Sequence, residues 1–191
     1  MNQENKNKIA IIGHTKGIGK AIADLYTKKN YEVLGLSRSN GYDLANGQEA
    51  IMEQLDDCQY IVVNAFAGKG QLSLLKRIYG KYHCEQKKVA VITSTSGTPQ
   101  GEDDEFGNAT YKEYCKFKKD LIEYIGELQQ ELVMRSLSVY DVCPDIVDTE
   151  MTTGLWEKYP KLEADEVAEA VRYCFVSKFN INKIVLQKNA I

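Results

Sequence analysis

Short apolar runs alternate with segments of helical periodicity along most of the chain. Six of these runs are rich in Val and Ile and are bounded by turn-forming residues, which is the pattern of buried strands. We expect strands at 9–12, 32–36, 60–64, 89–93, 138–142 and 183–186. Between them, apolar positions recur at helical spacing, and we expect helices at 17–29, 48–55, 72–81, 110–133 and 165–177.

Strands that alternate with helices predict a parallel sheet, because each parallel strand needs a long crossover and a helix usually provides it. Right-handed crossovers would make this sheet doubly wound, with helices on both faces. We therefore predict an α/β fold with a Rossmann-type sheet of six to seven strands. No repeat or Pro/Gly-rich linker interrupts the 191 residues, so we expect a single domain over 1–191.

The first predicted strand ends in a glycine-rich turn. Gly13, Gly17 and Gly19 form a G-x-x-x-G-x-G pattern between this strand and the first helix. A turn without side chains lets a phosphate approach the free N–H groups and the positive end of the helix dipole. The pattern predicts a nucleotide-phosphate site. The alternative is a turn whose glycines only let the strand and helix pack closely.

Composition narrows the class of ligand. The net charge of −3 gives no general basic field for nucleic acid. No apolar run is long enough to span a bilayer, and the polar start MNQENKNK lacks a signal-peptide core. Five cysteines without a C-x-x-C pair indicate reduced thiols, and two histidines argue against a metal site. We expect a cytoplasmic protein that binds no metal, membrane or nucleic acid.

Five short motifs lie close to the carboxyl ends of the predicted strands or on the long helix at 110–133. They are GHTKGIG at 13–19, VVNAFAG at 62–68, ITSTSG at 92–97, YCKFK at 114–118 and CPDIVDT at 143–149. In type and order they resemble the motifs of the short-chain dehydrogenase/reductase family, and the likeness runs from Lys8 to about Val185. The resemblance implies a Rossmann-type fold with a nicotinamide cofactor at the strand ends.

The resemblance implies a catalytic set of Ser94, Tyr114 and Lys118. Residues four apart share a helix face, so an ammonium at Lys118 would lower the pKa of the Tyr114 phenol from about 10. Tyr114 would exchange a proton with a carbonyl oxygen that Ser94 holds by a hydrogen bond. Ser96 is a second candidate for the serine role. In a chain with 12 tyrosines the Y-x-x-x-K spacing also arises by chance, so an amphipathic helix face is the alternative.

The resemblance also implies a set of cofactor-binding residues. They are Gly13, Thr15, Lys16, Gly17, Ile18, Gly19, Ser37, Arg38, Asp43, Leu44, Asn64, Ala65, Tyr114, Lys118, Pro144, Val147 and Thr149. NAD-binding folds place an acid after the second strand, but Ser37 and Arg38 stand there. Arg38 and Lys16 could clamp a 2′-phosphate, so we expect NADP(H) in preference to NAD(H). Two solvated surface cations are the alternative. Asp43 either lies near the adenine or only closes a turn.

Several features depart from the family pattern. The stretch 68–89 contains no asparagine, so the family's fourth catalytic residue has no counterpart that we can name. Asp145 replaces a glycine, and the loop at 96–108 is longer than usual. The substrate lid around 150–162 is short, and its Leu155, Trp156 and Tyr159 are candidates for an apolar substrate wall or for packing. In the family, the helix at 110–133 often forms dimers or tetramers, so a homodimer or homotetramer is the corresponding hypothesis.

These observations favour a compact NADPH-dependent oxidoreductase that transfers a hydride between the nicotinamide and a small carbonyl or alcohol substrate. A non-catalytic NADP(H)-binding sensor or scaffold is the alternative, suggested by the missing asparagine, Asp145 and the short lid. An extended-branch epimerase or dehydratase ranks last, because it would need an additional C-terminal lobe. The sequence does not identify the substrate.

Overall fold

A parallel sheet forms the centre of the protein. The computed structural model describes residues 7–99, 109–131 and 136–189. The six strands of these ranges are β1 (Lys8–Ile12), β2 (Glu32–Leu36), β3 (Tyr60–Val63), β4 (Lys88–Ile92), β5 (Ser138–Pro144) and β6 (Lys183–Leu186). They pair in the order β2-β1-β3-β4-β5-β6, and every pairing is parallel. Since the chain leaves β1 for β2 and then returns to β3 on the other side of β1, the switch point lies between β1 and β3.

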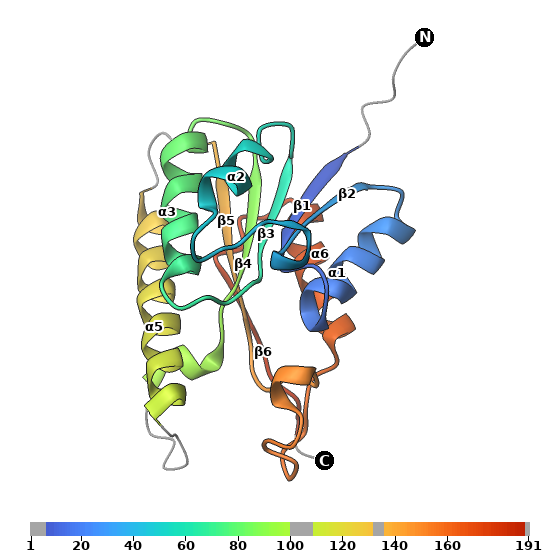
Figure 1. Cartoon of the computed structure of the whole chain (residues 1–191), viewed down its shortest axis with the longest axis vertical. Coiled ribbons are helices and arrows are strands. Elements are labelled where there is room, and N and C mark those ends of the chain that lie inside the picture. Colours follow the sequence, from blue (N-terminus) through green and yellow to red (C-terminus); the bar gives the residue numbers. More distant parts are fainter. Residues whose placement is uncertain (1–6, 100–108, 132–135, 190–191) are drawn as a thin grey trace.

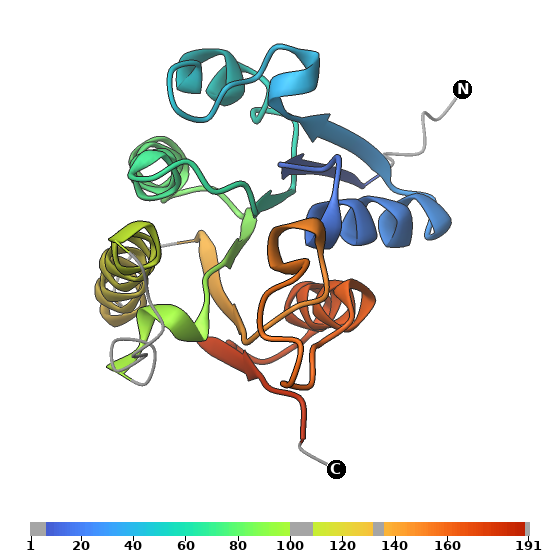
Figure 2. The same ribbon diagram turned by 60° about the horizontal axis from the view of Figure 1, so that its bottom comes forward.

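Helices cover both faces of this sheet (Figures 1 and 2). The described α-helices are α1 (Gly17–Lys28), α2 (Gln48–Glu53), α3 (Gly70–Tyr82), α5 (Ala109–Gln130) and α6 (Ala164–Val176). Ile9 and Ile11 of β1 join the core beneath α1 and α6, whereas Ala10 and Ile12 join the core beneath α2, α3 and α5. Successive strand residues point to opposite faces, so both faces of β1 are buried, as in other doubly wound sheets.

The predicted elements agree with the structure apart from their ends. The bounds of β2 and β6 are those predicted, β4 is shifted by one residue at both ends, and the other strands differ by one or two residues at one end. Helix α3 begins two residues early, at Gly70, which places Gln71 in its first turn. The end predicted for the long helix, at 133, and most of the loop predicted at 96–108 lie outside the described residues, as does its acidic run at 102–105.

The helices of the described ranges belong to the sheet's two covering layers. Each packs an apolar stripe on the sheet, and none has the length and apolar character needed to cross a membrane. The fold therefore confirms the predicted α/β sheet, with six strands in the described residues.

Candidate active site

The glycine turn joins the end of β1 to the start of α1, and steric contacts explain its composition. Gly13 and Gly17 have positive φ angles of 89° and 51°, which glycine adopts at little cost. A Cβ on Gly13 would lie 2.8 Å from that of Ala65, and a Cβ on Gly19 would overlap the Gly13 carbonyl oxygen. Asn64 donates a hydrogen bond of 2.9 Å to the same oxygen. The turn is therefore fixed by the end of β3, at the switch point of the sheet.

The N-terminus of α1 fits an anion. Its N-cap residue, Lys16, is extended and makes no side-chain capping hydrogen bond, and the first turn contains no acid. The first N–H groups of a helix have no acceptor within the helix. Since these groups and the helix dipole favour negative charge, the turn suits the diphosphate of a dinucleotide.

The residues after β2 are arranged around a short 3-10 turn, η1 (Arg38–Asn40). The Ser37 hydroxyl lies 2.8 Å from that of Ser39, and the Asn40 side chain accepts a hydrogen bond of 2.8 Å from the Ser37 N–H. Arg38 is exposed and forms no ion pair with a described residue. Lys16, the second expected phosphate ligand, instead pairs with Glu150 at 2.6 Å. That pair is exposed, so it contributes little and is easily replaced.

Asp43 closes a turn, which was one of the two roles expected for it. Its carboxylate accepts a hydrogen bond of 2.9 Å from the N–H of Ala45, and its carbonyl accepts one of 2.6 Å from Gly47. Leu44 is buried in the core beneath α2 and α3. In the glycine turn, Thr15 is exposed, whereas Ile18 packs partly against the core.

The loop after β5 approaches the glycine turn. Pro144 ends the strand, and Val147 is buried and bridges Leu162 of the lid. Thr149 is the N-cap of η3 (Glu150–Thr152), and its Cγ2 lies 3.0 Å from the position that a Cβ on Gly17 would occupy. The structure therefore brings this expected cofactor segment close to the glycine turn.

Ser94 and Tyr114 meet where β4 ends against α5. The buried Ser94 hydroxyl lies close enough to the Tyr114 phenol to lower the pKa of that phenol. Close packing of η2 (Thr95–Gly97) on α5 allows this contact, because a Cβ on Gly97 would lie 2.6 Å from the carbonyl carbon of Lys118. Ser96 instead accepts a hydrogen bond of 3.1 Å from Tyr111. Of the two serine candidates, the structure therefore places Ser94 at the phenol.

Lys118 lies one helical turn beyond Tyr114 and is 3 % exposed. Its Nζ donates hydrogen bonds of 2.9 Å to the Ile92 carbonyl oxygen and to Oε1 of Gln71. The same Nζ lies 5.6 Å from the centroid of the Tyr114 ring. The ammonium therefore sits beneath the aromatic ring, and its hydrogen-bond acceptors come from β4 and α3.

Gln71 is the site residue that the sequence analysis missed. It is 2 % exposed and donates hydrogen bonds of 2.9 Å to the carbonyl oxygens of Val63 and Ile92. The sequence carried one signal for it. Gln71 continues the buried stripe of Leu74, Leu75 and Ile78 on α3, so it is a polar residue on an apolar helix face.

Comparison with known proteins identifies the fold. No protein-family model and no curated protein sequence matches the chain. Solved structures do match. An oxidoreductase of the short-chain dehydrogenase/reductase family from Burkholderia thailandensis has a TM-score of 0.72 and 17% identity over 95% of this chain and 90% of its own. The chain has the short-chain dehydrogenase/reductase fold.

Two further structures with this fold were solved with nicotinamide cofactors. The 3-alpha-hydroxysteroid dehydrogenase from Pseudomonas sp. B-0831, complexed with NADH, has a TM-score of 0.77 and 20% identity over 94% of each chain. A short-chain dehydrogenase from Sphingobium yanoikuyae, in complex with NADPH, has a TM-score of 0.71 and 17% identity over 94% of this chain and 86% of its own. The short-chain dehydrogenase/reductase fold thus occurs with both cofactors.

Burial has the largest effect on the pKa values of Tyr114 and Lys118 in the candidate site. It raises the pKa of Tyr114 to about 12, and the neighbouring Ser94 hydroxyl lowers that pKa by a smaller amount. Burial also lowers the pKa of Lys118 to about 7, against the opposing effects of Cys143 and Asp141. The expectation that the Tyr114 pKa lies below its ordinary value is therefore wrong, because desolvation of the phenol raises the pKa by more than its neighbours lower it.

Aromatic rings surround the Tyr114 phenol. The Phe66 ring meets it edge-on with centroids 4.9 Å apart, and the Tyr111 ring stacks on it at 6.3 Å. Trp156 of the lid lies 5.7 Å from Tyr111 and has a φ angle of 50°, which is unfavourable for a bulky residue. Of the three candidate lid residues, Trp156 therefore reaches this aromatic group.

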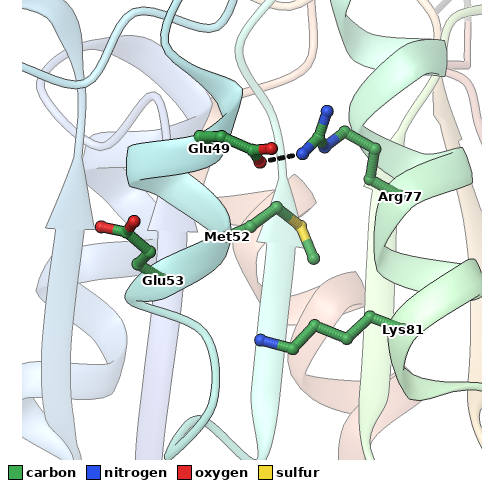
Figure 3. A pocket seen from close by; sticks show the side chains of 5 residues that line it. All are labelled: Glu49, Met52, Glu53, Arg77 and Lys81. Atoms are coloured by element: carbon green, nitrogen blue, oxygen red, sulfur yellow. Dashed lines mark hydrogen bonds and ion pairs between the residues drawn. The ribbon is translucent and has the colours of Figure 1, made fainter.

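A surface pocket between α2 and α3 shares no residue with this site (Figure 3). It is lined by Glu49, Met52, Glu53, Arg77 and Lys81. Arg77 pairs with Glu49, and Lys81 pairs with Asp56 at 2.5 Å. Both cations are thus neutralised by carboxylates at an exposed surface, and we assign no chemistry to this pocket.

Proposed function

We propose that the protein is an NADP(H)-dependent oxidoreductase that interconverts a carbonyl and an alcohol. The observation that carries the proposal is the position of Ser94 beside the Tyr114 phenol, one helical turn from the buried Lys118. A half-buried phenol beside a hydroxyl is a proton donor of the kind that carbonyl reduction needs. The short-chain dehydrogenase/reductase fold and its NADH- and NADPH-bound members support this choice.

Each part of the site has one task in this proposal. The bound nicotinamide supplies or accepts the hydride. The glycine turn and the N-terminus of α1 hold the diphosphate, and Asn64 and Thr149 lie beside this turn. In reduction, the carbonyl carbon gains the hydride and its oxygen takes the phenol proton of Tyr114. Ser94 donates a hydrogen bond to the oxygen as negative charge develops on it.

The preference for NADP(H) follows from charge. Arg38 is exposed directly after β2 and has no ion-pair partner among the residues described. A guanidinium can bind a 2′-phosphate through two parallel hydrogen bonds. Lys16 would join it once the exposed contact with Glu150 opens.

A turnover assay tests the proposed function. Purified protein is mixed with NADPH and a panel of aldehydes, ketones and quinones, and NADPH consumption is followed by absorbance. We expect oxidation of NADPH with at least one carbonyl class and a slower reaction with NADH. Tight binding of NADPH without turnover of any panel member would overturn the proposal.

That outcome would favour the second candidate, a non-catalytic NADP(H)-binding sensor. The observation on its side is the pKa of Tyr114, which burial raises to about 12. A phenol that stays protonated at neutral pH can donate a proton, but it is a poor base for alcohol oxidation. The same value therefore favours the reductive direction if the protein is an enzyme.

A further inference from the structure

The side chain of Gln71 connects three parts of the catalytic region. It projects from the first turn of α3, and its amide bonds to the ends of β3 and β4 through Val63 and Ile92. The same amide accepts a hydrogen bond from Lys118 of α5. A single buried side chain thus links two strand ends to the lysine.

The chemistry of its partners fixes the orientation of this amide. The backbone carbonyl oxygens of Val63 and Ile92 only accept hydrogen bonds, so the NH₂ group of Gln71 must face them. Its carbonyl oxygen is then left for Lys118, which only donates when it is protonated. No flipped amide satisfies all these contacts, since it would set oxygen against oxygen.

We propose that Gln71 is a positioning residue for Lys118, whose Nζ it holds beneath the Tyr114 ring by accepting a hydrogen bond. The hydrogen bond itself is part of the structure, but its role in catalysis rests on the proposed function. A buried ammonium without acceptors is strongly disfavoured. Gln71 and the Ile92 carbonyl provide the two acceptors that the described residues offer to Lys118.

The charged and titratable neighbours of Lys118 come from its own helix and from β5. Tyr114 lies on α5, and Asp141 and Cys143 lie on β5. Asp141 is itself engaged by Lys183 of β6 at 3.1 Å and by the Thr93 hydroxyl. The facing side chain of α3 is Gln71, which does not titrate, so its effect on Lys118 acts through the hydrogen bond.

NMR of isotope-labelled lysine side chains measures this effect without cofactor or substrate. The Lys118 resonance is assigned as the one missing in Lys118→Arg, and its pKa is then followed in two variants of Gln71. Gln71→Leu removes the acceptor, so we expect the pKa of Lys118 to fall by about one to two units. Gln71→Glu keeps an acceptor and adds negative charge, so we expect the pKa of Lys118 to rise, although the second carboxylate oxygen then faces the Val63 and Ile92 carbonyl oxygens.

Gln48 provides a matched control. Its amide also bridges two backbone carbonyl oxygens, donating at 2.9 Å to Leu44 and at 3.0 Å to Gly70, but it does not contact Lys118. Gln48→Leu should therefore lose comparable backbone hydrogen bonds and leave the Lys118 pKa unchanged. Equal pKa values in the folded Gln71→Leu and Gln48→Leu variants would overturn the proposal. If Gln71→Leu does not fold, an unshifted pKa in Gln71→Glu would overturn it.

The pH profile of carbonyl reduction provides the second readout. Loss of the Lys118 proton removes the charge that favours the Tyr114 phenolate, so reduction should slow as pH rises through the lysine pKa. In Gln71→Leu this decline should move to lower pH by the same one to two units, roughly. If Gln71→Leu turns over substrate and its rate declines at the same pH as in the wild type, the role of Gln71 is overturned and the proposed function stays intact. An absence of turnover with a shifted NMR pKa would overturn the function and leave the Gln71–Lys118 interaction supported.

Discussion

The two halves of the candidate site are built from different kinds of chemical group. The proposed nucleotide half, which is the turn at 13–19 with η1, is shaped by glycine backbone and carries exposed cations. The proposed catalytic half consists of Ser94, Tyr114 and Lys118 with the positioning residue Gln71, and its polar groups are buried except for the half-buried Tyr114. The first half depends on space for backbone and phosphate, and the second depends on hydrogen bonds that compensate for desolvation.

This difference decides what a substitution should do. In the nucleotide half, a methyl group added to a glycine would occupy space that the backbone or the cofactor phosphate needs, so it should abolish cofactor binding. In the catalytic half, a substitution that displaces hydrogen-bond donors or acceptors should change turnover and the pKa values of Tyr114 and Lys118, while the cofactor still binds. Each of the following experiments tests that separation.

Gly19→Ala should have the largest effect. Its Cβ would overlap the Gly13 carbonyl oxygen and lie 2.7 Å from the Asn64 amide nitrogen, so the turn must open. We expect a loss of about 3 kcal/mol in the free energy of unfolding, which is typical of severe overpacking. NADPH binding, measured by fluorescence titration, should disappear.

Gly80→Ala is the control for that substitution. Gly80 lies within α3, and a Cβ there would meet no atom within 4 Å beyond its chain neighbours and the nearby helix backbone, so alanine should stabilise the helix by about 1 kcal/mol. A Gly19→Ala variant that binds NADPH like the wild type would show that the tight turn is not needed for the nucleotide.

Gly97→Ala tests the catalytic half in the same way. Its Cβ would lie 2.6 Å from the Lys118 carbonyl carbon, which should push α5 away from Ser94. Turnover should fall roughly a hundredfold, as expected when a reacting group moves by about 1 Å, while the Kd for NADPH changes little. Gly126 lies on the same helix, and a Cβ there would face open space, so Gly126→Ala should keep full activity. Loss of NADPH binding in Gly97→Ala would contradict the separation of the two halves.

The pH dependence of stability should reveal the buried lysine. Lys118 has a pKa of about 7 in the folded protein, below its ordinary value of about 10.5, so the unfolded chain binds more protons between these pH values. Its contribution to stability therefore rises from pH 7 towards pH 10 and is lost again as pH falls. Urea unfolding of the wild type and Lys118→Met should show a stability difference that shrinks with rising pH. A constant difference would mean that Lys118 is not desolvated.

Arg38→Ala should have the smallest effect, because this residue is exposed. If the guanidinium binds the 2′-phosphate, NADPH affinity should fall about tenfold, near the lower end of what hydrogen bonds to a charged group contribute because the site is exposed, and NADH affinity should stay constant. Lys20→Ala removes a cation of α1 that is paired with Asp24 and should change neither affinity. Equal weakening of both cofactors by Arg38→Ala would refute the NADP(H) preference.

The sequence predicts the elements of this fold well because alternation and helical periodicity are local signals. The resemblance of the ITSTSG and YCKFK motifs to those of the family also predicts that Ser94 and Tyr114 lie close together. The sequence does not predict Gln71, because a polar residue in an apolar stripe does not identify its partner. The direction of the Tyr114 pKa shift was also missed, since sequence spacing shows the neighbouring cation but not how deeply both groups are buried.

The turnover of Tyr114→Phe, together with its Kd for NADPH, tests the central claim most directly. We predict that removing the hydroxyl abolishes carbonyl reduction and leaves the Kd within about threefold of the wild type, since the ring and its packing remain. Tyr124→Phe, on the same helix outside the site, should behave like the wild type. Undiminished turnover by Tyr114→Phe would contradict the assignment of the phenol as the proton donor.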